Sequence, residues 1–266
     1  MSGKTKIEWT EATWNPTTGC TEVSEGCDNC YAKTLAERFR GTPGHYFEHG
    51  FDMMMREAKL TEPLRWRRPR KVFVDSMSDL FHKDIPDEYI ARVFGVMALA
   101  GQHTYQVLTK RPGRMRSLLS SSQFPDLLGE CIADLADHPL RKAAGTYRVN
   151  YPLPNVWLGT SVENQKWADV RVPLLADTPA AVRFLSCEPL LGSVSIPIEC
   201  SPSIDWVIVG GESGQRSRPM HPDWARRLRD ECTDVGIAFL FKQWGGPRPK
   251  SNGRELDGRT WDEYPA

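Results

Sequence analysis

The sequence, 266 residues long, has no long apolar run and no excess of charge of either sign. Its apolar runs, such as 207–209 and 239–241, fall far short of the roughly 20 residues that a membrane-spanning helix needs, and its N-terminus is polar rather than signal-like. Lys plus Arg and Asp plus Glu both number 34, so no overall basic field exists to hold a long stretch of duplex DNA. These absences argue against chromosome-coating roles and predict a cytoplasmic protein with no membrane partner.

Length and composition indicate a folded protein. Apolar residues make up 40% of the chain, which at this length still buries a sizeable core. A single α/β barrel takes roughly 250 residues, so one domain over residues 1–266 is the simplest organisation.

Seven short segments rich in β-branched and aromatic residues alternate with helical patterns. The segments are 12–15, 71–76, 104–109, 155–162, 181–187, 204–211 and 237–244. Several are nearly continuous apolar runs, which suits parallel strands buried on both faces. After Pro86 and after Pro222, apolar residues recur at helical spacing. The alternation predicts an α/β fold with an incomplete parallel TIM-like barrel of six or seven strands in a single domain, and a doubly wound open sheet is the alternative.

Three stretches interrupt this alternation. Residues 41–70 read as a polar, His-containing loop followed by a Met-rich helix around Met53, Met54 and Met55. Residues 120–154 read as an insertion with a helical part. The tail, 245–266, is rich in Gly, Pro and charge, so we expect it to be extended and to cover one end of the sheet.

Charged side chains stand at the carboxyl ends of six of the seven predicted strands. They are Asp75, Lys110, Glu163, Glu188, Glu212 and Lys242. The carboxyl ends of parallel strands open onto a shared cavity, where reacting groups of α/β proteins sit. Buried strands often lead into polar loops for no functional reason. Six such ends in succession nevertheless predict a polar catalytic or cofactor cavity.

Cysteines give the strongest local signal. The odd count of seven in a chain without a signal sequence argues against a disulfide framework. Cys20, Cys27 and Cys30 fall within eleven residues, whereas the other four are scattered. Three local thiolates suit an iron–sulfur cluster with one open iron, or a zinc site completed by a distant His or Cys. Three unrelated structural cysteines are the simplest alternative.

Several stretches together resemble a known family. They are Thr13-Trp14-Asn15-Pro16, Gly19-Cys20, Gly26-Cys27-Asp28-Asn29-Cys30-Tyr31-Ala32, Ser76-Met77-Ser78-Asp79-Leu80-Phe81, Leu108-Thr109-Lys110-Arg111-Pro112, Ser186-Cys187-Glu188-Pro189-Leu190-Leu191, Gly210-Gly211-Glu212-Ser213-Gly214 and Phe241-Lys242-Gln243-Trp244-Gly245. The chain resembles, over most of residues 5–265, a phage- and mobile-element-associated three-cysteine branch of the radical S-adenosylmethionine (radical SAM) superfamily. It departs from the superfamily pattern in two ways. Six residues rather than three separate Cys20 from Cys27, and Asn29 occupies the position of an aromatic residue.

The resemblance implies a cofactor and a chemistry. Cys20, Cys27 and Cys30 would hold a [4Fe-4S] cluster whose fourth iron binds S-adenosylmethionine, and an electron from the cluster would release a 5′-deoxyadenosyl radical that abstracts hydrogen from the substrate. Such an enzyme needs an external electron donor. The phage association of the resembled branch and local basic clusters suggest a nucleotide or nucleic-acid base as substrate, and the host cytoplasm as the location if a phage encodes the protein.

The resemblance also implies roles for the strand ends. Asp75, Ser76 and Ser78 would contact the methionine amino group. Ser161, Glu163, Ser186 and Glu188 would meet the ribose and carboxylate groups of the cofactor. Lys110 would pair with the cofactor carboxylate. Glu212 and Lys242, together with Lys110, are the candidate catalytic residues, the first two facing the substrate.

Two other classes of protein remain open. One is a zinc-stabilised nucleic-acid-binding or hydrolytic protein that uses the same three thiols. The other is a non-catalytic barrel that acts as an interaction module. Basic clusters at 65–70 and 110–116 could contact phosphate, although a solvated face is the simpler interpretation.

Overall fold

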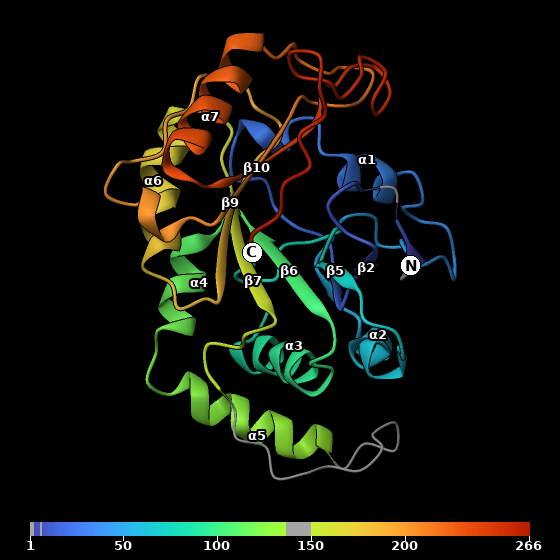
Figure 1. Ribbon diagram of the computed structural model, residues 1–266. Helices are drawn as coiled ribbons and strands as arrows, with labels where there is room; N and C mark the ends of the chain where they lie inside the picture. Colours follow the sequence, from blue (N-terminus) through green and yellow to red (C-terminus); the bar gives the residue numbers. More distant parts are fainter. Residues whose placement is uncertain (1–2, 6, 137–149) are drawn as a thin grey trace. The chain divides into compact units, whose positions relative to one another are not determined.

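The computed structural model describes residues 3–5, 7–136 and 150–266 (Figure 1). It contains an eight-stranded sheet in the order β1-β2-β5-β6-β7-β8-β9-β10. The strands are β1 (Gly3–Lys4), β2 (Ala12–Trp14), β5 (Lys71–Val74), β6 (Thr104–Thr109), β7 (Val156–Ser161), β8 (Val182–Cys187), β9 (Trp206–Gly210) and β10 (Ala238–Gln243). Only the two-residue β1 is antiparallel to its neighbour among the pairs whose register is defined.

The predicted fold class is confirmed: an α/β fold with an incomplete parallel barrel of seven strands, preceded by one short antiparallel strand. Each of the seven predicted strand segments contains one observed strand, and sheet order follows chain order. The strands form because their residues are β-branched or aromatic and are buried; every residue of β9 is buried, as expected for a strand covered on both faces.

The chain forms two compact units. The first unit comprises residues 1–21, 32–158 and 178–181, and the second comprises residues 22–31, 159–177 and 182–266. The loop at 22–31, which carries Cys27 and Cys30, therefore belongs to the second unit although it lies early in the sequence.

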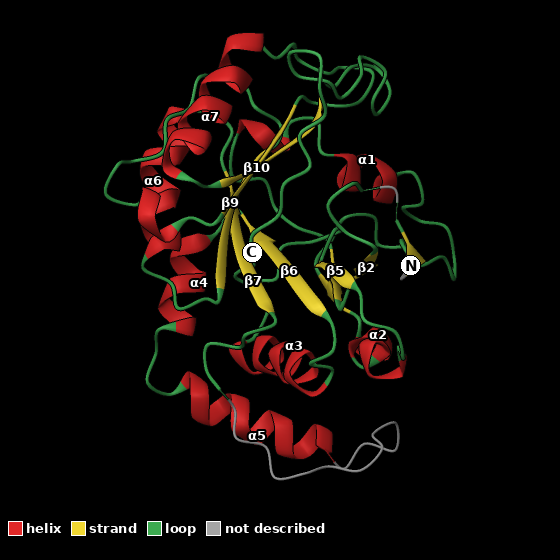
Figure 2. Ribbon diagram, viewed as in Figure 1, coloured by secondary structure: helices red, strands yellow, loops and turns green. Residues whose placement is uncertain are grey.

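In the first unit, helix packing follows the apolar pattern. The helices are α1 (Tyr31–Glu37), whose first residue belongs to the second unit, α2 (Glu57–Leu60), η2 (Glu62–Arg65), α3 (Asp87–Leu99), α4 (Pro112–Leu119) and α5 (Phe124–Ala136). In the view of Figure 2, α3 lies between β6 and α5. The rings of Phe94 and Phe124 meet edge to face, with centroids 5.5 Å apart. Asp87 and Glu88 lie in the first turn of α3, where their negative charges interact favourably with the positive end of the helix dipole.

The predicted Met-rich helix is wrong. Met54–Met55 form a short strand, β4, that pairs antiparallel with β3 (Thr17–Thr18), and the helix α2 begins only at Glu57. The pairing is reinforced from Arg56, whose Nε donates to Thr18 Oγ1 at 2.8 Å. Long-range pairing with residues far earlier in the chain thus overrides the helical preference of methionine.

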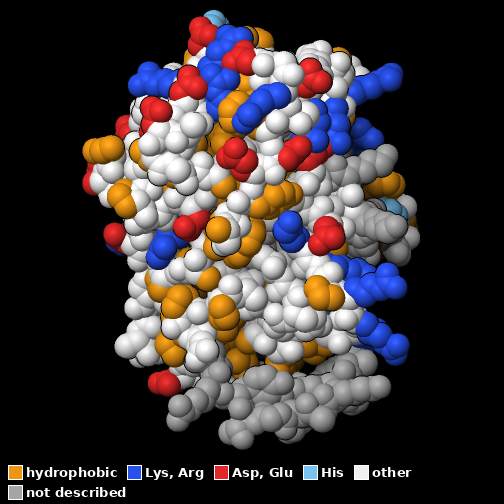
Figure 3. All heavy atoms as spheres, in the orientation of Figure 1, with side chains coloured by type: hydrophobic (Ala, Val, Ile, Leu, Met, Phe, Trp, Pro, Cys, Tyr) orange, Lys and Arg blue, Asp and Glu red, His pale blue; other side chains and the backbone are white. Residues whose placement is uncertain are grey.

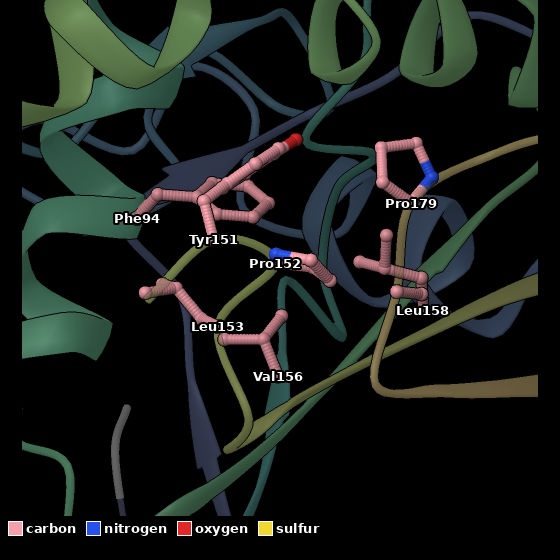
Figure 4. A pocket seen from close by; sticks show the side chains of 8 residues that line it. Phe94, Tyr151, Pro152, Leu153, Val156, Leu158 and Pro179 are labelled. Carbon is pink, nitrogen blue, oxygen red and sulfur yellow. The ribbon is translucent and has the colours of Figure 1, made fainter. Parts of the chain in front are cut away.

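The predicted insertion at 120–154 contains α5, and its residues 137–149 lie outside the described residues. An apolar pocket lies between α3 and the segment that follows this gap (Figure 4). It is lined by Phe94, Tyr151, Pro152, Leu153, Val156, Leu158, Pro179 and Ala180. No charged side chain lines it, so it belongs to the packing of the first unit.

The second unit contains η1 (Glu25–Cys27), α6 (Gln165–Ala176), η3 (Ser201–Ser203) and α7 (Pro222–Val235). Helix α7 packs on β9 and β10 through Ala225, Leu228 and Cys232, and it ends at Gly236, whose φ of 77° suits a glycine cap. Its outer face carries mixed charge. Arg226 and Arg229 both bind Asp257, and Figure 3 shows acidic and basic side chains intermingled where α7 lies.

The C-terminal tail runs along β10. The Phe241 N–H donates to the Trp261 carbonyl at 2.9 Å, and the Trp206 indole donates to the Glu263 carbonyl at 2.9 Å. The tail thereby covers the outer edge of the last strand. Over the part of the chain that the structure describes, no helix combines the length and the apolar character needed to cross a bilayer.

Candidate functional site

The structure separates the seven cysteines into two groups. Four are buried in the core: Cys131, Cys187, Cys200 and Cys232. Burial raises the pKa of each of these four thiols, that of Cys232 to about 12. A thiol binds metal or acts as a nucleophile in its thiolate form. Because the raised pKa makes the thiolate harder to form, these four thiols are unreactive.

The other three cysteines are only half-buried and lie in connecting segments between β2 and α1. Cys20 comes two residues after β3, Cys27 ends η1, and Cys30 directly precedes α1. The expected position, in the loop after the first parallel strand, is therefore correct. No disulfide joins any of the seven cysteines, all of which are among the described residues.

In the first unit, Arg111 holds the segment around Cys20. One guanidinium nitrogen, Nη1, lies 3.3 Å from Cys20 Sγ and 3.0 Å from Asp79 Oδ2. The other, Nη2, donates to the Thr21 carbonyl at 2.9 Å. A fixed cation beside a sulfur atom favours its thiolate form. Arg111 therefore positions Cys20 and places a cation beside its sulfur atom.

Asp79 joins the ends of β5 and β6. Its Oδ1 accepts from the Thr109 hydroxyl at 2.7 Å, and its Oδ2 accepts from the Lys110 N–H at 3.0 Å as well as from Arg111. The Asp79 side chain is almost fully buried. It fixes the backbone of Lys110, which is the predicted catalytic and cofactor-binding lysine of this strand end.

Three side chains nominated for the cofactor's amino group hold the chain that leads to Cys20. The two oxygens of the Asp75 carboxyl group accept from the Thr17 N–H at 3.0 Å and from the Thr17 hydroxyl at 2.9 Å. The Ser76 hydroxyl donates to Asn15 Oδ1 at 3.1 Å, and the Ser78 hydroxyl donates to the Gly19 carbonyl at 2.7 Å. Their role at a cofactor stays a prediction. In the structure, they hold residues 15–19 in place through hydrogen bonds.

Asp75 is also strained and shifted in pKa. It has a left-handed φ of 58°, which is uncommon for a residue other than glycine. Burial, aided by the charge of Asp79, outweighs the hydrogen bonds from Thr17 and raises the pKa of Asp75 to about 8. Such a combination at a strand end is frequent in functional regions.

In the second unit, Glu163 anchors the loop at 22–31. One carboxylate oxygen accepts from the Ser24 hydroxyl at 2.7 Å, and the other pairs with Arg171 at 2.9 Å. Both Glu163 and Arg171 have at most 1% of their side chains exposed. A Cβ added to Gly26 would lie 2.4 Å from Glu163 Oε1, so only glycine lets this loop approach the carboxylate.

Glu212 anchors the same loop from the end of β9. Its carboxylate accepts from Asn29 Nδ2 at 2.9 Å and from Arg218 through two side-chain nitrogens at 2.6 and 3.0 Å. Arg218 also reaches Asp28 at 3.1 Å and the Glu25 carbonyl at 2.8 Å. Burial alone would raise the pKa of Glu212, but the hydrogen bonds from Arg218 and Asn29 outweigh it and lower that pKa.

Glu25 completes the attachment of the loop to α6. Its carboxylate accepts from the Trp167 indole at 2.8 Å and from the Asn164 amide. The indole contact is the main reason that the pKa of Glu25 is lowered. The segment with Cys27 and Cys30 is thus held by three carboxylates, two of them the strand-end residues Glu163 and Glu212.

Glu188 and Lys242 form a separate polar pair in the second unit. Lys242 Nζ lies 2.6 Å from Glu188 Oε1, and the two side chains keep 17% and 20% exposure. Gln243 Nε2 donates to Ser213 Oγ at 2.7 Å beside them. This pair, at the ends of β8 and β10, has no part in holding the cysteine loop and keeps enough exposure to meet a small molecule.

Ser161 and Ser186, both nominated for cofactor binding, are buried inside the second unit. The Ser161 carbonyl accepts from Arg171 at 2.9 Å, and the Ser186 carbonyl accepts from the Val162 N–H at 2.9 Å. Their backbones support the ends of β7 and β8.

Sequence reasoning missed the residues that organise these contacts. They are Arg111, Arg171, Arg218, Asn29 and Asp79. Three are arginines that follow a nominated strand end: Arg111 comes next to Lys110, Arg171 eight residues after Glu163 and Arg218 six residues after Glu212. A buried carboxylate needs such a cation, so a nearby arginine is a usable signal.

Within the described residues, no three His, Cys, Asp or Glu side chains form a group that could hold a metal ion. Cys20 belongs to the first unit, and Cys27 and Cys30 belong to the second. Convergence of the three sulfur atoms therefore stays a prediction.

Comparison with known proteins corrects one expectation. A family model described as a protein of unknown function, DUF5131, matches residues 4–265, and no radical SAM family model matches. No curated protein and no solved structure matches the chain. The resemblance to a phage- and mobile-element-associated branch of the radical SAM superfamily is therefore wrong as an assignment. Because the match spans nearly all of the sequence, the chain belongs to the DUF5131 family.

Proposed function

We propose that this protein is an iron–sulfur enzyme in which Cys20, Cys27 and Cys30 hold a [4Fe-4S] cluster that cleaves S-adenosylmethionine reductively. One observation carries the proposal. Of seven cysteines, only these three are half-buried, and they are the three that lie together in the sequence, between β2 and α1. A metal centre requires thiols that lie outside the core and that are held in position by the segments around them.

The donor set fits such a cluster. Three thiolates bind three irons and leave one iron for an outside ligand. When bound, the cluster would supply the electron that breaks the sulfonium bond and releases a 5′-deoxyadenosyl radical. Arg111, beside Cys20, favours the thiolate and donates a hydrogen bond to its sulfur.

The chain's own residues hold the ligand segments still. Glu163 and Glu212 hold the loop of Cys27 and Cys30, and the hydroxyl of Ser78 holds the Gly19 carbonyl directly before Cys20. Ligands on rigid segments lose little freedom when metal binds, which raises affinity.

A cofactor and a substrate need further polar groups with some exposure. Lys242 and Glu188 supply a cation and an anion 2.6 Å apart at the ends of β8 and β10, the two strands that flank β9. Lys242 would bind a carboxylate or phosphate, and Glu188 would bind a hydroxyl or amino group. A nucleotide or nucleic-acid base carries both kinds of group and is the substrate class that we propose. The reduced thiols fit the cytoplasm, where an external donor would supply the electron.

Metal analysis tests the proposal directly. The protein, purified and reconstituted without oxygen, should carry about four irons and as many sulfides per chain. Cys20→Ala, Cys27→Ala and Cys30→Ala should each lose most of this iron. Cys200→Ala, which removes a buried thiol, should keep it and serves as the matched control. Addition of a reductant and S-adenosylmethionine should then release 5′-deoxyadenosine.

A different metal content would contradict the proposal. Stoichiometric zinc that survives in air, without bound sulfide, would instead favour a structural zinc site, and loss of folding in the Cys30→Ala variant would support that alternative. Partner binding that persists in all three cysteine variants, with no metal in the wild type, would indicate a non-catalytic interaction module.

A further inference from the structure

The strongest unpaired charge of the first unit lies in residues 65–70, directly before β5. The sequence there is Arg-Trp-Arg-Arg-Pro-Arg, and no acidic residue occurs between Glu62 and Asp75. Arg65, Arg67 and Arg68 are exposed, whereas Trp66 and Arg70 are half-buried. We call residues 65–70 the arginine strip.

The exposed arginines of the strip lack partners. Among the residues that the structure describes, none forms an ion pair or side-chain hydrogen bond with Arg65, Arg67 or Arg68. Many other arginines of the described residues are neutralised by a nearby carboxylate, and those that are not stand singly rather than in a cluster. Arg40, for example, pairs with Glu37 and Asp52. The strip thus accumulates charge that the fold itself does not offset, in a chain of zero net charge.

The other basic cluster predicted from the sequence behaves differently. In the cluster at 110–116, Arg111 binds Asp79, and Arg114 binds Asp87 and the Ile85 carbonyl. These two guanidinium groups are therefore already paired with groups of the first unit. The arginine strip, by contrast, keeps three neighbouring cations without an ion pair among the described residues.

The backbone of the strip is anchored while its charges face solvent. The Trp66 carbonyl accepts from Gln102 Nε2 at 3.0 Å, and the Trp66 ring packs edge-on against His103 with centroids 5.6 Å apart. The Arg70 guanidinium lies over the same ring, 5.1 Å from its centroid. A strip fixed in this way loses little backbone freedom when a partner binds.

We infer that the arginine strip binds the phosphate backbone of a nucleic acid. Arginine presents a planar fork that matches phosphate, and the strip uses arginine throughout. A membrane surface fits less well, because none of the large exposed apolar side chains, which are Tyr31, Met55, Val170, Ile198 and Val235, belongs to the strip. Contacts to phosphate carry no base preference, so the strip binds without sequence specificity.

The strip is distinct from the candidate site. It precedes the first residue of β5, Lys71, whereas Asp75, Asp79 and the segment of Cys20 lie beyond the last residue, Val74. The two therefore stand at opposite ends of this strand within the first unit. The inference does not require the proposed cluster and would hold for a chain without metal.

Nucleic-acid titrations test the inference. Fluorescently labelled single-stranded and double-stranded DNA of about 20 nucleotides would be titrated with the full-length protein at several salt concentrations. The variant with Arg65→Gln, Arg67→Gln and Arg68→Gln should bind at least about tenfold more weakly. Its plot of log affinity against log salt should be shallower by about 2 for single strands, because each lost phosphate contact removes roughly 0.7.

A matched control separates the effect of the arginine strip from the effect of lowering the net positive charge. The variant with Arg38→Gln, Arg227→Gln and Arg248→Gln removes the same charge from three scattered, exposed positions. It should bind DNA nearly as the wild type does. Equal loss of affinity in both triple variants would overturn the inference, as would binding of the wild type to anionic phospholipid vesicles but not to DNA.

Two further measurements keep this inference apart from the proposed function. The strip variant should retain the wild-type iron content and thermal unfolding midpoint, and Cys27→Ala should retain DNA binding. Loss of iron in the cysteine variant with intact DNA binding supports both ideas. Absence of iron with intact, strip-dependent DNA binding would remove the proposed function and leave the inference standing.

Discussion

Glu163 and Arg171 meet where almost no water reaches either side chain. Removal of one partner leaves the other charge buried without compensation, which typically costs about 3–5 kcal/mol. We expect Arg171→Met to lower the free energy of unfolding by this order, as measured by urea denaturation. Because Arg171 also stacks on Trp167, 4.0 Å from the ring centroid, methionine keeps part of the packing.

A double variant provides the control for this prediction. Glu163→Gln combined with Arg171→Met removes both charges together, so it should be less destabilised than Arg171→Met alone. If the double variant lost as much free energy of unfolding as the two single variants together, the two charges would not be coupled, which would contradict the prediction.

Asp75 should make stability depend on pH. Its pKa, about 8 in the folded protein against an ordinary 3.8, means that the folded state holds a proton that the unfolded state releases. The stabilisation is fully present below the ordinary pKa and is lost as pH rises towards 8. The free energy of unfolding should therefore fall by up to about 1.4 kcal/mol per pH unit in this window.

Asp75→Asn tests this dependence. Asparagine tolerates the left-handed backbone at this position and resembles the protonated acid, so the variant should unfold with a flatter pH profile between about pH 5 and pH 8. Urea midpoints at several pH values measure the difference. Parallel profiles for the variant and the wild type would show that Asp75 does not titrate in this range.

At the scale of elements, the loop at 22–31 depends on the glycine that faces Glu163. Gly26→Ala places a methyl group 2.4 Å from Glu163 Oε1, so the loop or the buried carboxylate must shift. We expect a stability loss of about 1–3 kcal/mol and a fall in iron per chain after reconstitution. Gly129→Ala, in α5, meets nothing within 4 Å and should change neither quantity for the worse. Normal iron content in the Gly26→Ala variant would show that this contact does not position Cys27 and Cys30.

The elements themselves could largely be read from the sequence. The strands β6 and β9 are runs of β-branched and aromatic residues bounded by polar or glycine-containing turns, and such runs have few alternatives. The strand at Met54–Met55 could not be read in this way. Two residues carry no periodicity, and their pairing with Thr17 and Thr18 comes from residues more than thirty positions earlier.

The same distinction applies to the candidate site. The strand-end residues and the three cysteines could be named because each follows a recognisable strand or lies in one short segment. Their partners could not. The pairing of Asn29 with Glu212 joins residues 183 positions apart, and no local pattern specifies such a contact. Sequence reasoning also assigned Glu163 and Glu212 to a cofactor and a substrate, whereas their oxygens bind the loop at 22–31 and two arginines.

For the whole molecule, the two groups of cysteines predict a simple labelling pattern. Without metal, a maleimide should modify three thiols rapidly and four only on unfolding, because the four are buried and have raised pKa values. Peptide mass spectrometry should place the rapid labels on Cys20, Cys27 and Cys30. Reconstitution with iron and sulfide should protect these three. Rapid labelling of Cys187 or Cys232 in the native protein would contradict the arrangement of the core.

The tail segment that lies beside β10 has a consequence for self-association. An uncovered last strand would present unpaired amide and carbonyl groups on which a second molecule could add its own strand. The hydrogen bonds from Phe241 to Trp261 and from Glu263 to Phe239 occupy that row instead. The tail thus covers the edge on which a second molecule could add a strand, and we expect a protein truncated ahead of Trp261 to aggregate more readily than the full-length chain.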